Sequence, residues 1–138
     1  TWNACIAEVY VDPESGIVDV KKLTFAIDCG TVINRDGALA QIEGSALFGL
    51  SMALHEELEF TYGQFPQKNF NEYKMLRLKD APKIEIELIE TGGQPVGLGE
   101  PATTTVAPAV ANAIFDAVGI RVKKLPIRPD DIRNQLSS

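Results

Sequence analysis

Alternating apolar and polar positions dominate the first thirty residues. Residues 2 to 11 place apolar side chains on both faces of an extended chain, and residues 17 to 28 resume the same period of two. The intervening Asp12-Pro13-Glu14-Ser15-Gly16 has the composition of a four- or five-residue turn. The pattern predicts an antiparallel hairpin of two strands.

The period changes to three and four residues between Ala38 and Leu58, which predicts an amphipathic helix. Asn34 or Asp36 can provide its N-cap. Gly44 and Gly49 lie inside this helix, where each glycine costs about 1 kcal/mol relative to alanine. Their presence predicts that something packs very close to that helix surface.

The second half of the chain is less regular at first and then returns to clear elements. In order, the pattern predicts a loop over 59 to 82 with a short helical turn around 71 to 78, a strand over 84 to 88, an alanine-rich helix over 101 to 118 ending at Gly119, a short strand over 121 to 127, and a terminal helix over 129 to 136. Pro108 should kink the alanine-rich helix or mark the start of its regular part. The order β-β-α-β-α-β-α, led by a hairpin, predicts one α+β domain over residues 1–138.

The composition of the chain limits the classes of molecule that it is expected to bind. The 138 residues are enough to bury a core, and the net charge of -6 provides no basic surface for nucleic acid. No apolar run approaches the roughly twenty residues that span a bilayer, so no transmembrane segment is expected. The chain enters its first strand almost at once and without an initiator methionine, which favours a piece of a longer protein.

Several kinds of site are not indicated. His55 is the only histidine, and its place late in the first helix favours an exposed residue there. Equal stepping along the hairpin places Cys5 opposite Leu23 and far from Cys29, so we expect two free, buried thiols. One histidine and two distant cysteines cannot form a metal cage, and the glycine-rich phosphate-binding motifs are absent.

Two surfaces marked by glycine remain as candidate sites. In Gly97-Leu98-Gly99-Glu100-Pro101, the glycines permit positive φ and close approach of a ligand, and Pro101 suits the first position of a helix. Glu100 therefore lies near the N-cap, where free N–H groups favour negative charge. On the first helix, Gln41 and Ser45 share a face beside the glycines. A plain capped helix and ordinary helix packing are equally compatible with these patterns.

Five blocks occur in the order and approximate spacing of a known family: Asp28-Cys29-Gly30, Val32-Ile33-Asn34, Gln41-Ile42-Glu43-Gly44, Gly97-Leu98-Gly99-Glu100-Pro101 and Ala111-Asn112-Ala113-Ile114-Phe115-Asp116-Ala117. Together they resemble the C-terminal part of the molybdenum-binding large subunit of the xanthine dehydrogenase and aldehyde oxidase family. Within it, Gly-Leu-Gly-Glu-Pro-Ala-Thr-Thr and Asn-Phe-Asn-Glu-Tyr look most like the bacterial isoquinoline 1-oxidoreductase and aldehyde dehydrogenase large subunits.

The resemblance implies a molybdenum hydroxylase that uses water as the oxygen source and acts on an N-heterocycle or an aldehyde. It implies that Glu100 is the catalytic base and that Gln41 hydrogen-bonds the pterin cofactor. It also implies that the backbone of Val96, Gly97, Leu98 and Gly99 forms the loop beneath the metal. The family holds its metal through the sulfurs of the cofactor, so no protein metal ligand is expected.

The same resemblance implies partners. The cofactor would be molybdopterin, as molybdenum cytosine dinucleotide, held mainly by the remainder of the large subunit, and a small 2Fe–2S subunit would carry electrons from the small-molecule substrate. We expect the isolated 138 residues to bind no cofactor and to have no hydroxylase activity. A non-catalytic binding or subunit-assembly domain is the alternative, and it predicts that Gln41 and Glu100 point away from each other. A weaker third possibility is an anion-binding module at residues 97 to 105.

Overall fold

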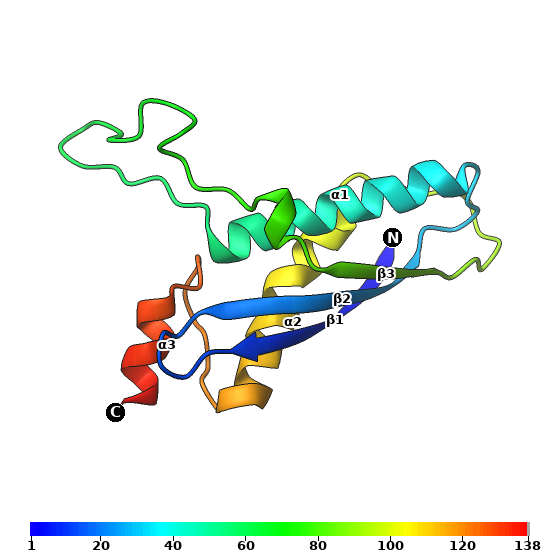
Figure 1. The fold of residues 1–138 in the computed structure, drawn as a ribbon. Helices are drawn as coiled ribbons and strands as arrows, with labels where there is room; N and C mark the ends of the chain where they lie inside the picture. The colour runs from blue at the N-terminus through cyan, green and yellow to red at the C-terminus, as the bar shows by residue number, and fades with distance from the viewer. Residues whose placement is uncertain (138) are drawn as a thin grey trace.

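The fold is one three-stranded sheet with helices on one of its faces, in a computed structural model that describes residues 1–137 (Figure 1). Its elements are β1 (Trp2–Val11), β2 (Val18–Asp28), α1 (Arg35–Leu54), the 3-10 turn η1 (Leu78–Asp80), β3 (Lys83–Leu88), α2 (Pro101–Val118) and α3 (Pro129–Leu136). The strand order is β1-β2-β3, and the core lies between the sheet, α1 and α2. The predicted α+β class is confirmed.

The predicted hairpin is present, but its register differs from the prediction. β1 and β2 pair antiparallel, and a bulge between Glu8 and Val9 shifts the pairing. The turn pairs Val11 with Val18, one residue beyond the predicted Ile17, and the bulge adds one further residue, so Cys5 lies opposite Phe25 and not opposite Leu23. Cys5 and Cys29 are both free thiols, as predicted, although Cys5 is only half-buried.

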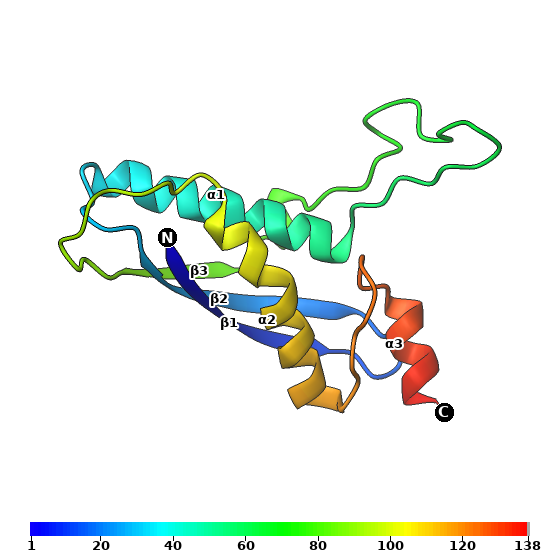
Figure 2. The same cartoon turned by 180° about the vertical axis from the view of Figure 1, so that it is seen from behind.

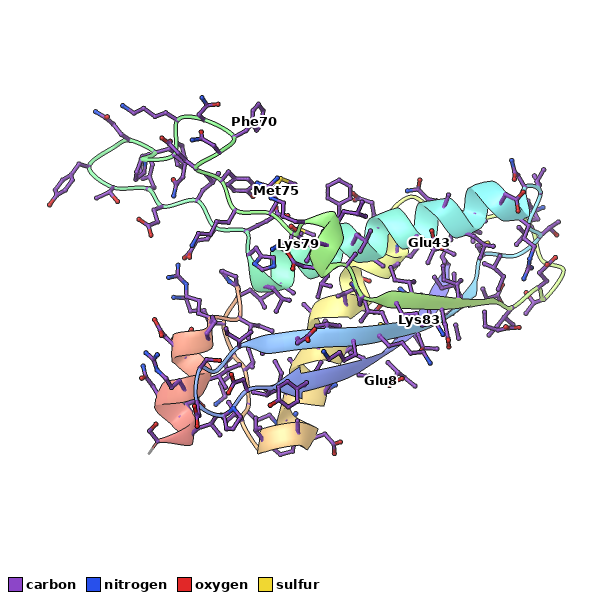
Figure 3. The ribbon with its side chains drawn as sticks, in the orientation of Figure 1. Glu8, Glu43, Phe70, Met75, Lys79 and Lys83 are labelled. Atoms are coloured by element: carbon purple, nitrogen blue, oxygen red, sulfur yellow. The ribbon has the colours of Figure 1, made fainter. Side chains whose placement is uncertain are left out.

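The strand β3 pairs parallel with β2, from Lys22 opposite Lys83 to Ile27 opposite Leu88. A row of charges crosses the outer face of the sheet, where Glu8 and Lys83 are visible in Figure 3. Lys22 Nζ lies 3.5 Å from Glu8 and 2.8 Å from Glu85, and Lys83 Nζ lies 2.7 Å from Glu85. Hydrogen bonds from Lys22 and Lys83 lower the pKa of Glu85 to about 2. Exposed ion pairs of this kind contribute little to stability, so the row mainly keeps this end of the face polar.

The helix α1 begins at Arg35, just after Asn34, one of the two predicted N-cap residues, and it ends before the predicted Leu58. The Asn34 side chain accepts a hydrogen bond from the Gly37 N–H at 2.9 Å, and the helix ends at Leu54. By length and composition alone α1 could cross a membrane, because its most apolar stretch of 18 residues has a mean hydropathy of 1.2. One face of it, including Ile42 and Leu50, is fully buried in the core of the described residues. In this fold α1 is therefore a core helix.

The two helical glycines have different surroundings. A Cβ on Gly49 would lie 2.9 Å from the Thr103 carbonyl oxygen and 3.2 Å from Val106 Cβ, so α2 packs there as closely as predicted. A Cβ on Gly44 would meet no neighbouring atom of the described residues within 4 Å, so no part of them makes the predicted close contact there.

This difference gives a stability prediction. Gly49→Ala should lower the free energy of unfolding by about 1–3 kcal/mol because the Thr103 backbone must move. Gly44→Ala, the matched control, should raise it by up to about 1 kcal/mol through helix propensity alone. Urea unfolding of the chain, followed by circular dichroism, measures both. Equal effects would mean that α2 does not approach α1 at Gly49.

Residues 55–77 form an irregular arm that extends away from the sheet and helices (Figures 1 and 3). The predicted helical turn at 71 to 78 is absent, and only η1 follows the arm. Phe70 and Tyr62 are almost fully exposed on it. Its anchors to α1 include the Leu76 N–H, which donates to Ser51 Oγ at 3.0 Å.

The C-terminal segment lacks one predicted element. α2 continues through Pro108 and ends at Gly119, which has a φ of 74°. Residues 121 to 127 form no strand. The Ile127 N–H instead donates to the Ala53 carbonyl at 2.7 Å, which ties the segment to the end of α1 before α3 begins.

Candidate functional site

One long loop, residues 89 to 100, connects β3 to α2 and passes the carboxyl end of β2 and the start of α1 (Figure 2). It begins beside β2, where the Ile89 N–H donates to the Ile27 carbonyl at 2.8 Å. It ends at Glu100, the N-cap residue of α2. The loop therefore brings the Gly97-Leu98-Gly99-Glu100-Pro101 block to the same end of the fold as the three blocks that precede it in the sequence.

The connection between β2 and α1 holds the first part of this loop. The Thr31 N–H and hydroxyl donate to the Gly93 carbonyl at 3.0 and 2.8 Å, and Thr91 Oγ1 donates to an Asp28 oxygen at 3.0 Å. Gly30 has a φ of 74°, and a Cβ there would lie 2.2 Å from the Gln94 carbonyl oxygen. Glycine is required at this position both by its backbone angle and by the space available.

The second part of the loop is held by the N-terminal residue, by the connection that follows β2 and by α1. Val96 N–H donates to the Cys29 carbonyl at 3.0 Å, Thr1 Oγ1 donates to the Gly97 carbonyl, and Gln41 Nε2 donates to the Gly99 carbonyl. Three segments far apart in sequence thus fix consecutive parts of one loop. Gln41 is bound to the residue immediately before Glu100.

The start of α2 is fixed from β1. Asn3 Nδ2 donates to the Pro101 carbonyl at 2.6 Å, and Thr105 Oγ1 donates to Asn3 Oδ1 at 2.8 Å. Thr103 Oγ1 also donates to the Ser45 carbonyl of α1 at 2.9 Å. These bonds hold the first turn of α2, and with it the position of Glu100.

The glycines of the loop leave its backbone accessible. Neither Gly97 nor Gly99 has a positive φ, so the expected backbone freedom is not what glycine provides here. A Cβ on either residue would meet no described atom within 4 Å. Leu98 between them packs against the core and anchors the loop. The two glycines therefore leave a bare stretch of backbone that a ligand can approach.

Glu100 is exposed, and its side chain makes no capping hydrogen bond. Its carboxylate has no ion-pair or hydrogen-bond partner among residues 1–137. It lies where the first N–H groups of α2 are unsatisfied by the helix itself. A carboxylate held in place by its backbone and free of partners is able to accept a proton from a bound molecule.

Gln41 retains hydrogen-bonding capacity after it contacts the loop. A primary amide has two N–H donors and one carbonyl acceptor. One donor is used on the Gly99 carbonyl. The other donor and the acceptor have no partner among the described residues, so Gln41 can bridge the loop to a further polar group.

Other candidate chemistry lies away from this loop. His55 is the C-cap residue of α1 and half-buried rather than exposed, and its burial lowers the pKa of the imidazole. Burial also raises the pKa of the Cys5 thiol to about 11. Within residues 1–137 no group of three or more histidine, cysteine, aspartate or glutamate side chains is placed to hold a metal ion.

Sequence reasoning missed the residues that support this loop. No periodic or motif signal marks Thr1, Asn3, Thr31 or Thr105. Each acts through hydrogen bonds to residues 62 to 102 positions away in the sequence. Gly30 was part of a recognised block, but its steric role was visible only with Gln94 in place.

Comparisons with known proteins agree on one family. The family described as molybdopterin cofactor-binding domain matches residues 1–82. A membrane-bound aldehyde dehydrogenase (pyrroloquinoline-quinone) of Gluconacetobacter polyoxogenes is 48% identical over 138 residues, which is 100% of this chain and 18% of that protein. Isoquinoline 1-oxidoreductase subunit beta of Brevundimonas diminuta is 33% identical, covering 91% of this chain and 16% of that protein.

A solved structure has the same fold. Quinoline 2-oxidoreductase from Pseudomonas putida 86 superposes with a TM-score of 0.85 at 27% identity, over 94% of this chain and 18% of that chain. The chain studied here therefore spans less than a fifth of the length of these three proteins. Its fold corresponds to one part of a much larger subunit.

Proposed function

Because this chain belongs to the molybdopterin cofactor-binding domain family, we propose that it provides the proton-accepting loop of a molybdenum hydroxylase, with Glu100 as the general base. The observation that carries the proposal is the set of hydrogen bonds from Thr1, Thr31 and Gln41 to the loop, and from Asn3 to Pro101, that fixes the backbone on both sides of Glu100.

The residues present are compatible with a pterin cofactor. The backbone of Val96, Gly97, Leu98 and Gly99 offers an approachable surface because no described atom lies near a Cβ position on either glycine. Gln41 retains one N–H donor and one carbonyl acceptor for the polar edge of a pterin. We propose these five residues as the part of the cofactor site that this chain contributes.

The name of one relative specifies pyrroloquinoline quinone, a different cofactor. That name describes a whole protein of which this chain corresponds to 18%, whereas the molybdopterin assignment comes from a match to this chain's own residues 1–82. We therefore propose molybdopterin as the cofactor. From the resemblance of the sequence blocks, we further propose the cytosine dinucleotide form and a 2Fe–2S partner subunit that removes electrons.

The proposed reaction is hydroxylation of an N-heterocycle or oxidation of an aldehyde. When bound, the molybdenum cofactor would supply oxygen derived from water and accept two electrons from the substrate. Glu100 would accept the proton released as the oxygen attacks the substrate carbon, from its position as the N-cap residue of α2. Gln41 would hydrogen-bond both the loop and the cofactor and so fix their relative positions.

The alternative is a non-catalytic binding or assembly domain. It predicts that Gln41 and Glu100 point apart. Gln41 is hydrogen-bonded to the Gly99 carbonyl, so its side chain lies beside the backbone that carries Glu100, and this proximity supports the catalytic proposal. Gly49 is already used for packing within the chain, and only Gly44 has the open surface that contact between subunits would need.

Isotopic labelling tests the proposal. The complete subunit with its partners, supplied with an aldehyde or N-heterocycle in oxygen-labelled water, should form product that carries the label, and metal analysis should find molybdenum. The isolated residues 1–138 should form no product, because most of the cofactor site lies outside them. Product labelled from molecular oxygen, or pyrroloquinoline quinone in place of molybdenum, would contradict the proposal.

A further inference from the structure

One polar side chain interrupts the inner face of β1, the face against which α2 packs (Figure 2). Cys5, Ala7 and Val9 on this face are half-buried and pack against the core, and Val11 belongs to the core. Asn3 continues the same alternation and is half-buried as well. An amide in such a row needs hydrogen-bond partners, and Asn3 finds them in α2.

Both ends of the Asn3 amide are used. Its Nδ2 donates to the Pro101 carbonyl at 2.6 Å, and its Oδ1 accepts from Thr105 Oγ1 at 2.8 Å. An ionised carboxylate at this position could accept from Thr105 but could not donate to Pro101. The donor and the acceptor of one side chain therefore tie β1 to two residues near the start of α2.

The residue that Asn3 holds comes directly after Glu100. On the other side of Glu100, the N-terminal residue and α1 hold the Gly97 and Gly99 carbonyls. Glu100 itself has a φ of -137° and a ψ of 19°, and its carboxylate makes no hydrogen bond within residues 1–137. The position of its Cβ therefore depends on the backbone at each side, and the Asn3 amide ties Pro101 to another element.

Thr104 makes a similar contact with a different consequence. Its Oγ1 donates to the same Pro101 carbonyl at 2.8 Å, but from within the same helix. Thr105 Oγ1 also has a bond of this kind, to the Ala102 carbonyl at 3.3 Å. Such local bonds satisfy a carbonyl without fixing the helix relative to the sheet. The two threonines therefore separate local bonding in α2 from the tie to β1.

We propose that Asn3, held by Thr105, is a positioning residue for the proton transfer: through the Pro101 carbonyl it fixes the backbone of Glu100 relative to the sheet. The proposal rests on the proposed function of Glu100. Misplacing a catalytic group by about 1 Å can lower a rate about 100-fold, even when the change lies away from the reacting atoms. Loss of the tie should therefore lower kcat and leave KM and cofactor content nearly unchanged.

Substitutions of the two threonines in the complete enzyme test the proposal. Thr105→Val removes the hydroxyl that Asn3 binds and should lower kcat at least about tenfold, with KM and molybdenum per subunit changing less than about twofold. Thr105→Ser keeps the hydroxyl and should retain kcat within about twofold of the wild type. Thr104→Val, the matched control, removes only a bond within the helix and should retain nearly full kcat.

Combination with Glu100→Gln shows whether the tie acts through Glu100. Asn3→Ala should reproduce the kcat loss of Thr105→Val, and neither change should lower kcat further in the Glu100→Gln enzyme. Additive losses would overturn the proposal, because Asn3 would then act independently of the carboxylate.

The remaining outcomes separate this proposal from the proposed function. Equal kcat in Thr105→Val and Thr104→Val, failure of Thr105→Ser to retain kcat, or loss of molybdenum in Asn3→Ala would overturn the positioning role. If Glu100→Gln is inactive while Thr105→Val has wild-type kcat, only the positioning role fails. Full turnover in Glu100→Gln alone would contradict the proposed function, whatever the threonine variants show.

Discussion

Replacing Glu100 with glutamine in the complete enzyme should lower kcat by at least about 100-fold, because general-base catalysis typically contributes about 100- to 10,000-fold. Glutamine has nearly the shape of glutamate but cannot accept the proton at ambient pH. The Glu100 carboxylate has no hydrogen-bond or ion-pair partner in residues 1–137. The substitution therefore removes no contact that holds the fold together.

The informative measurement is turnover together with bound molybdenum. We expect kcat to fall while molybdenum per subunit stays close to that of the wild type, because Gln41 and the loop backbone are unchanged. Glu90→Gln is the matched control: Glu90 belongs to the same loop and is exposed, and Arg35 lies 3.5 Å away. It should retain nearly full activity. Retained turnover in Glu100→Gln would end the assignment of Glu100 as the base, and loss of molybdenum would indicate a binding role instead.

Much of the fold could be predicted because it is encoded in local periodicity. The hairpin, α1 with its Asn34 cap, and α2 from Pro101 to Gly119 all follow from spacing and capping residues. The bulge between Glu8 and Val9 could not be predicted, because apolar residues on both faces of β1 leave the register weakly specified. The absent strand at 121 to 127 shows the limit of a short segment with only three apolar residues among charges and a proline, where the Ile127 N–H bonds to α1 and not to a strand.

The sequence motifs of the candidate site could be predicted, but the contacts that bring those motifs together could not. The glycine–glutamate loop and Gln41 could be identified from the sequence blocks, but their contact through the Gly99 carbonyl joins residues 58 positions apart. Such contacts have no sequence period. The roles of the loop glycines also depend on neighbours, since Gly97 and Gly99 provide access whereas Gly30 permits close packing.

Gly30→Ala should displace the loop and reduce turnover more than any other single glycine substitution near the site. Gly30 has a φ of 74°, which costs alanine about 1–2 kcal/mol, and its Cβ would lie 2.2 Å from the Gln94 carbonyl oxygen. That contact is with backbone and cannot be relieved by a side-chain rotation. The loop must move away from the segment that contains Cys29 and Thr31, so we expect its hydrogen bonds to weaken.

Gly92→Ala separates the effect of the positive φ from the effect of the close contact with Gln94. Gly92 lies in the same loop with a φ of 76°, but a Cβ there would meet no described atom within 4 Å, so only the cost of about 1–2 kcal/mol for its backbone angle applies. Hydrogen exchange in the complete subunit should show the Thr31 and Val96 amides losing protection in Gly30→Ala by at least about tenfold more than in Gly92→Ala. Turnover and molybdenum content should fall in the same order, because the loop carries Glu100 and the proposed cofactor contacts. Equal losses in the two variants would mean that the backbone angle alone matters and that the contact between Gly30 and Gln94 does not position the site.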